Sequence, residues 1–188
     1  MVSKEEKIMS EYIFDARNAA IGDWGELHIK ERYEKIGCKV KRNSYDSIDL
    51  TVTKPDGKVF WVEVKTHREY ELKTGDIVRK IFKCVCVSKY QIEQFRKYKD
   101  NVLLVWIQIN SGKILGRRLD YLLETHFVDG EEFPYIKEFS DDKVSYCFPE
   151  QLFEEIGHLT GAEYSDLLEI AEKKTNDDPI DGDNDFSF

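Results

Sequence analysis

Two carboxylates and a lysine recur at a spacing that could hold a metal ion. Thirteen residues separate Asp49 from Glu63, and Lys65 follows two positions later. Carboxylate oxygens are the ligands that Mg²⁺ prefers in proteins, and a lysine beside them could stabilise developing negative charge. The spacing therefore predicts a divalent-cation site, provided that the chain brings the two acids together.

A β-hairpin over residues 47–66 would do this. Pro55-Asp56-Gly57 suits a three-residue loop with a left-handed glycine, so that Lys54 pairs with Lys58 and Asp49 lies opposite Glu63. Side chains two apart in a strand share a face. One face then carries Asp49, Glu63 and Lys65, and the other carries Ile48, Leu50, Val52, Phe60, Val62 and Val64. Opposed like charges destabilise a sheet unless a cation lies between them; the alternative is an exposed, charged face.

A helix over residues 22–37 precedes the hairpin, with Gly37 as its C-terminal stop. Its apolar stripe of Ile29, Tyr33 and Ile36 also passes through Glu26. A carboxylate on a core-facing stripe needs a partner, so the helix is expected to bring Glu26 to the sheet. The alternative is an acid in the first helical turn, where the helix dipole favours it.

In order, Gly25-Glu26, Ile48-Asp49-Leu50 and Val62-Glu63-Val64-Lys65-Thr66 resemble the PD-(D/E)xK nuclease superfamily. Over residues 20–110 the pattern is most similar to its Holliday-junction-resolvase-like and Mrr-like members. Ile48-Asp49 stands where the family has Pro-Asp. Asp46 is a competing candidate for the aspartate of this Pro-Asp pair, but the hairpin register places Asp46 on the face opposite to Glu63.

The resemblance implies a Mg²⁺-dependent DNA endonuclease, with Mn²⁺ able to substitute, acting in recombination, repair or phage replication as a homodimer. Asp49 and Glu63 would hold the metal, with the Val64 carbonyl as a further ligand. Glu26 would bind a second metal or orient a water. Lys65 would orient the attacking water or stabilise charge on phosphorus.

Basic residues after the hairpin are candidate DNA contacts. Arg68, Lys73, Arg79 and Lys80 could bind backbone phosphates, or belong to a solvated loop. Gln91 is a further candidate DNA contact, because it lies where the superfamily places an accessory polar residue. It also completes a capping box with Ser88.

The predicted fold is α/β, a restriction-endonuclease-like mixed sheet flanked by helices. Strands at Ile81–Val87 and Asn101–Ile109 enclose a helix that starts at Ser88. Residues 1–119 would form the nuclease core with its N-terminal helix, and residues 120–174 a mostly helical extension packed on the core. That extension would comprise a short helix at 120–125, a strand at 144–148, and helices at 150–159 and 163–174. Residues 175–188 would form a disordered acidic tail.

Charge divides between the same segments. Residues 1–119 hold 24 Lys and Arg against 17 Asp and Glu, net +7; residues 120–188 hold 4 against 20, net −16, which together give the overall −9. The part that carries the motif is therefore the basic part, as DNA binding requires. The tail, with five Asp and a terminal Phe186-Ser187-Phe188, would recruit a replication or repair protein, cover the basic groove, or only aid solubility.

The four cysteines have no zinc-type spacing, and Cys84 and Cys86 are expected to be buried thiols in a reducing compartment. The sequence shows no signal peptide and no apolar run that could span a membrane. We therefore expect a cytoplasmic or virus-encoded protein. The alternative function is a non-catalytic DNA-binding or scaffold protein on the same fold.

Overall fold

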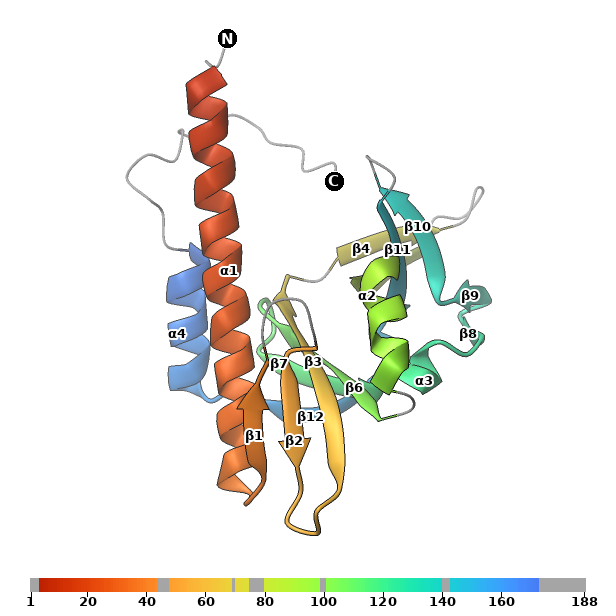
Figure 1. Ribbon diagram of the computed structural model, residues 1–188. Coiled ribbons are helices and arrows are strands. Elements are labelled where there is room, and N and C mark those ends of the chain that lie inside the picture. Colours follow the sequence, from red (N-terminus) through yellow and green to blue (C-terminus); the bar gives the residue numbers. More distant parts are fainter. Residues whose placement is uncertain are drawn as a thin grey trace.

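The computed structural model describes residues 4–43, 48–68, 70–74, 80–98, 101–139 and 143–172, with backbone only at 4–15, 139 and 143. The chain is mixed α/β, with a six-stranded mixed sheet flanked by helices (Figure 1). The elements to residue 98 are α1 (Lys4–Lys35), β1 (Lys39–Arg42), β2 (Leu50–Thr53), β3 (Val59–His67), β4 (Tyr70–Thr74), β5 (Lys80–Ser88), α2 (Lys89–Phe95) and the 3₁₀ turn η1 (Arg96–Tyr98). The elements after it are β6 (Val102–Gln108), β7 (Lys113–Arg118), α3 (Leu119–Leu122), β8 (His126–Val128), β9 (Glu131–Phe133), β10 (Tyr135–Phe139), β11 (Lys143–Pro149), the 3₁₀ turn η2 (Glu150–Leu152), β12 (Glu154–His158) and α4 (Gly161–Glu172).

The larger sheet has the order β1-β2-β3-β6-β7-β12. Its central pair, β3 and β6, is parallel, and its other neighbours are antiparallel. β6 is almost wholly buried, because the sheet is covered on both faces. The predicted strand at Asn101–Ile109 is confirmed.

The hairpin register is the predicted one. Thr51 pairs with Trp61 and Leu50 with Val62, and the Lys54 amide donates to the Lys58 carbonyl at 2.8 Å. Gly57 has φ +83°, the left-handed conformation that the loop requires. One expectation is wrong: Ile48 packs in the cluster that holds Trp61, and not with Leu50 and Val62. The alternation of faces fails there because β2 begins only at Leu50.

α1 and α4 cover one face of this sheet (Figure 1). Ile21 and Ile29 of α1 and Leu167 of α4 pack on Val62 and Val64. α1 ends where predicted: the Gly37 amide donates to the Glu34 carbonyl and the Cys38 amide to the Tyr33 carbonyl, with Gly37 at φ +87°. At its other end α1 is longer than the predicted helix and begins at Lys4.

α1 approaches β3 most closely at Gly25. A Cβ built on Gly25 would lie 1.8 Å from Thr66 Oγ1 and 3.0 Å from Thr66 Cβ, whereas a Cβ on Gly22 meets nothing within 4 Å. We expect Gly25→Ala to lower the free energy of unfolding by about 1–3 kcal/mol, because a stiff β-branched side chain must move. Urea denaturation measures this.

Gly22→Ala is the matched control, since it makes the same change in the same helix without a clash. It should leave stability unchanged or raise it by up to about 1 kcal/mol through helix propensity. Equal effects of the two alanines would contradict a close contact at Gly25.

The other face of the larger sheet packs against α2 and a second sheet. This four-stranded sheet has the order β10-β11-β5-β4. Trp61, Leu104 and Trp106 share one buried cluster with Ile92 of α2 and Val85 of β5. The predicted strand at Ile81–Val87 and the helix after Ser88 are confirmed.

Beyond residue 119 the expected, mostly helical extension is wrong in its secondary structure. The described residues between 119 and 172 contribute five strands, of which β12 joins the larger sheet and β10 and β11 join the four-stranded one. The short helix, the strand at 144–148 and the last helix are present as α3, β11 and α4. The helix expected at 150–159 is instead η2 followed by β12, because this segment pairs along β7. The tail lies outside the described residues.

The cysteine expectation is corrected at Cys86. Cys86 and Cys147, opposed on β5 and β11, form a disulfide, while Cys84 is a buried free thiol as expected. In the described part of the chain, no helix is long and apolar enough to cross a membrane.

Candidate active site

The structure brings Glu63, Lys65 and Gln91 together on the face of the larger sheet that α2 covers, and it holds Asp49 at the neighbouring hairpin strand. Asp49 lies immediately before β2, and its Oδ2 accepts a hydrogen bond from the Val64 amide of β3 at 2.7 Å. This bond ties the carboxylate of one hairpin strand to the backbone of the other. Val64 itself is buried.

Glu63 is the most deeply buried member, with 2% of its surface exposed. Its Oε1 accepts from Lys65 Nζ at 2.7 Å and from Gln91 Nε2 at 3.0 Å. Lys65 Nζ also donates to Gln91 Oε1 at 3.4 Å. A buried carboxylate is costly unless charged and polar groups pair with it, so Lys65 and Gln91 explain why Glu63 is tolerated here.

Gln91 takes part in the predicted cap, and its side chain also contacts Glu63, while its role as an accessory residue stays a prediction. Ser88 is the N-cap of α2, and its Oγ accepts from the Gln91 amide at 3.2 Å. The Gln91 side chain meanwhile reaches Glu63. The cap fixes the first turn of α2, and this turn holds the side-chain amide of Gln91 against the Glu63 carboxylate.

Asp49 carries a strongly perturbed carboxyl group. Burial raises its pKa to about 8, and the charges of Glu63 and Glu26 add to this, while the Val64 amide and Lys65 oppose it. A group that is costly to ionise beside another carboxylate is a candidate for cation binding, since a cation would relieve both burial and repulsion.

This raised pKa predicts a pH-dependent stability. The folded protein holds a proton on Asp49 at pH values where the unfolded chain, with a carboxyl pKa near 3.8, has lost it. The Asp49 contribution to stability is therefore present below about pH 4 and lost as pH rises towards about 8. Urea midpoints between pH 5 and 9 should fall more steeply in the wild type than in Asp49→Asn. Identical slopes would contradict the raised pKa.

Glu26 reaches the same region but is bound elsewhere. Its Oε2 accepts from Arg42 Nη2 at 2.7 Å and from Arg42 Nε at 3.0 Å, and Arg42 Nη2 also donates to Asp23 Oδ1 at 2.6 Å. Within the described ranges, no three His, Cys, Asp or Glu side chains form a group that could hold a metal ion. Glu26 is thus within electrostatic reach of Asp49 but is bonded to Arg42, and its role as a ligand stays a prediction.

The carboxylate oxygens of Asp49 and Glu63 suit a divalent cation that prefers oxygen ligands. Asp49 Oδ1 and Glu63 Oε2 accept no hydrogen bond from the residues that the structure describes. Two such carboxylates are the usual protein contribution to Mg²⁺, which keeps several waters of its own. The chemistry of these side chains therefore suits Mg²⁺ or Mn²⁺.

The predicted DNA contacts are dispersed. Arg68 follows β3 and is exposed, and Lys73 is exposed on β4. Lys80 donates to the Asp129 carbonyl at 2.5 Å and pairs with Glu131 at 3.1 Å, so it reaches the β8–β9 hairpin. Arg79 lies outside the described residues. The phosphate contacts proposed for these residues stay predictions.

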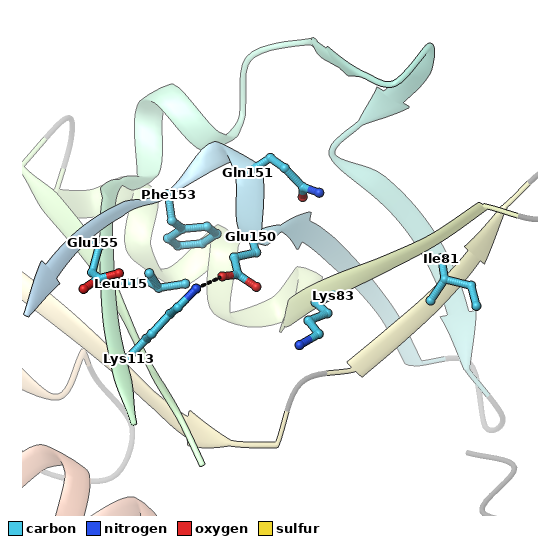
Figure 2. Close-up of a pocket in the computed structure, with 8 residues that line it drawn as sticks. All are labelled: Ile81, Lys83, Lys113, Leu115, Glu150, Gln151, Phe153 and Glu155. Carbon is cyan, nitrogen blue, oxygen red and sulfur yellow. Dashed lines mark hydrogen bonds and ion pairs between the residues drawn. The ribbon is translucent and has the colours of Figure 1, made fainter. Parts of the chain in front are cut away.

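A cavity of about 410 Å³ lies on the same face of the larger sheet (Figure 2). Its wall includes Leu115 of β7. Leu115 pairs with Trp106 of β6, and Trp106 pairs with Lys65 of β3, so the cavity lies two strands away from Glu63. Figure 2 shows the ion pair between Lys113 and Glu150 inside it. Lys83 and Lys113 are balanced there by Glu150 and Glu155, and the cavity contains none of the predicted site residues.

Arg42 is the site residue that sequence reasoning missed. Only the pairing of β1 with β2, which places Arg42 opposite Leu50, brings it beside Asp49. Asn43 belongs to the same contact: its amide donates to the Asp49 carbonyl at 2.8 Å, and its side chain to the Ile48 carbonyl and Thr51. A cationic residue shortly before the predicted hairpin was the available signal.

Comparison with known proteins adds little to this geometry. No protein-family model matches the sequence, and no curated protein matches it. Among solved structures, the chain is similar to a nuclease from a fusselovirus, with 10% sequence identity, a TM-score of 0.40, and coverage of 89% of this chain and 95% of that one. A likeness of this extent carries no argument about activity, so the case for a function depends on the side chains of the candidate site.

Proposed function

We propose that the protein is a Mg²⁺-dependent DNA endonuclease of the PD-(D/E)xK type, with Asp49, Glu63 and Lys65 as its catalytic residues. The observation that carries the proposal is that a buried glutamate bonded to a lysine lies beside an aspartate of raised pKa on the two strands of one hairpin. A carboxylate pair with a lysine suits the hydrolysis of a phosphodiester, in which negative charge develops on phosphate oxygens.

Bound between Asp49 and Glu63, Mg²⁺ would supply Lewis-acid polarisation of the phosphate and a water of lowered pKa. The Val64 amide holds the Asp49 carboxylate in place, and Gln91 holds that of Glu63. Lys65 Nζ, only partly exposed, is available to donate to the attacking water or to a phosphate oxygen. Each residue is held by a second one, as a preorganised site requires.

The positive charge of exposed side chains supports a nucleic acid as the substrate. The exposed cations Arg42, Lys89 and Arg68 lie within three residues along the chain of Asn43, Gln91 and Lys65, in the part of the chain that carries net +7. Such a surface favours a polyanion over a small neutral substrate. We extend the proposal to a homodimer acting in recombination, repair or phage replication, and to a partner protein bound by residues 175–188.

A nuclease assay tests the proposal. Purified full-length protein is incubated with single-stranded, duplex, flap and four-way-junction DNA, with Mg²⁺, with Mn²⁺ or with EDTA. Cleavage of at least one substrate that requires the metal supports the proposal. Metal-independent DNA binding without cleavage of any substrate would instead favour the non-catalytic scaffold, for which the engagement of Glu26 by Arg42 is the specific observation.

A further inference from the structure

Among the residues that the structure describes, Arg42 is the hydrogen-bond partner of the Glu26 side chain. Both hydrogen bonds from Arg42 end on the same oxygen, Glu26 Oε2, and Arg42 is held in addition by Asp23. Two acids on successive turns of α1 therefore share one guanidinium. This fixes the Glu26 side chain on Arg42 of β1.

The backbone keeps Glu26 close to the candidate site all the same. Gly25 lies against Thr66, the residue after Lys65, which brings this turn of α1 onto β3. On β1, Arg42 lies opposite Leu50, and the Asn43 amide donates to the Asp49 carbonyl at 2.8 Å. Arg42, which binds Glu26, is therefore next in the chain to a residue that binds Asp49. A coupling between Arg42 and the candidate site requires that the Glu26 side chain can rotate away from Arg42.

Arg42 is also accessible from solvent. Its side chain is 39% exposed, against 22% for Glu26. A guanidinium presents paired donors that match a phosphate as well as they match a carboxylate. A DNA backbone that reaches the carboxylate pair would therefore compete with Glu26 for Arg42.

We propose that Arg42 is a positioning residue that couples DNA binding to metal binding, by holding Glu26 in the free protein and releasing it when a backbone phosphate takes its place. The released carboxylate turns to Asp49 and Glu63 and completes a three-acid site. The inference rests on the proposed nuclease function, and it names the DNA backbone as the ligand of Arg42.

The coupling has a required sign. If DNA releases Glu26 to the metal site, then DNA must raise metal affinity and the metal must raise DNA affinity by the same factor. Removing Arg42 should produce the released state without DNA. An exposed ion pair and one added carboxylate ligand each contribute modestly to binding. We therefore expect the loss of Arg42 to raise the affinity for the metal ion by about tenfold.

The first experiment measures Mn²⁺ binding to the full-length, DNA-free protein by electron paramagnetic resonance. Arg42→Ala should bind Mn²⁺ about tenfold more tightly than the wild type. Glu26→Gln should bind as the wild type does, because Glu26 is engaged elsewhere. The double variant Arg42→Ala/Glu26→Gln should show no gain in Mn²⁺ affinity and should bind Mn²⁺ as Glu26→Gln does.

Three outcomes are decisive. Unchanged or weaker Mn²⁺ binding in Arg42→Ala, with a native circular dichroism spectrum, would overturn the coupling. An equal gain in the double variant would overturn the role of Glu26. Wild-type protein that binds no Mn²⁺, with or without DNA, would instead overturn the proposed nuclease function. Arg42→Gln, which keeps side-chain bulk, replaces Arg42→Ala if the alanine variant does not fold.

The second experiment tests the phosphate contact without metal. Binding of a fluorescent duplex is followed by anisotropy in EDTA across a range of salt concentrations. Arg42→Ala should weaken binding and lower the slope of log affinity against log salt by about 1, as the loss of one phosphate contact does. Arg118→Ala, which removes an exposed arginine paired with Asp120, is the control and should leave the slope unchanged. An unchanged slope in Arg42→Ala would overturn the phosphate contact.

Discussion

Glu63→Gln is expected to lower Mg²⁺-dependent DNA cleavage by at least about 10³-fold, because a metal ion contributes several kcal/mol to such a reaction and each 1.36 kcal/mol is a factor of ten. Glutamine keeps the shape of the side chain and an oxygen that accepts from Gln91 and Lys65. The fold should therefore survive while the charge is lost. DNA affinity in EDTA should be unchanged or higher, since a negative charge near the phosphate is removed.

The control for this variant is Glu155→Gln on β12. Glu155 lies opposite Leu115 of β7, on the same face of the sheet as Glu63 but three strands away from β3. The Glu155→Gln variant should therefore retain full activity. The measurement is the single-turnover cleavage rate on the best substrate of the panel. Wild-type rates in both Glu63→Gln and Asp49→Asn would show that the carboxylates are not the metal site.

Lys65→Ala is expected to lower the cleavage rate by about 10²-fold, as the loss of one group that stabilises the transition state does. Metal affinity should stay equal or rise, because Lys65 Nζ now occupies Glu63 Oε1 at 2.7 Å and competes with a cation there. Calorimetric titration with Mn²⁺ and the single-turnover rate separate the two effects.

Lys58→Ala, at the hairpin loop and 79% exposed, makes the same change far from the site and should leave both quantities unaltered. If Lys65→Ala abolished metal binding but kept a normal rate per bound metal, Lys65 would be a structural partner of Glu63 and not a catalytic group.

The local parts of this site were predictable from sequence. Pro55-Asp56-Gly57 determines the register of the hairpin, and that register is what brings Asp49 to the backbone of β3 next to Glu63. Ser88 and Gln91 form a cap that needs only a spacing of three. In each case the interacting residues are close in the chain, so turn and capping rules apply directly.

Contacts between distant segments were not predictable in the same way. Cys86 and Cys147 are 61 residues apart, and no local pattern shows that β11 lies beside β5. Leu152, Ile156 and Leu159 have helical spacing, yet Phe153 is extended at φ −98° and ψ 158° because the segment adds to the edge of β7. Tertiary pairing overrode the local pattern there. Arg42 was missed for the same reason.

The parallel pairing of β3 with β6 also sets the order in which the site can assemble. Leu50 and Val62, partners in the hairpin, are 12 residues apart, whereas Val62 and Leu103, partners across β3 and β6, are 41 apart. Closing the longer loop costs about 1 kcal/mol more in chain entropy on the logarithmic law, and β4, β5 and α2 must be placed within it. The hairpin that unites Asp49 with Glu63 is thus a short-range structure, whereas the Gln91 that binds Glu63 arrives with the crossover. A chain that loses the crossover would keep its two acids side by side and lose the amide that stabilises them.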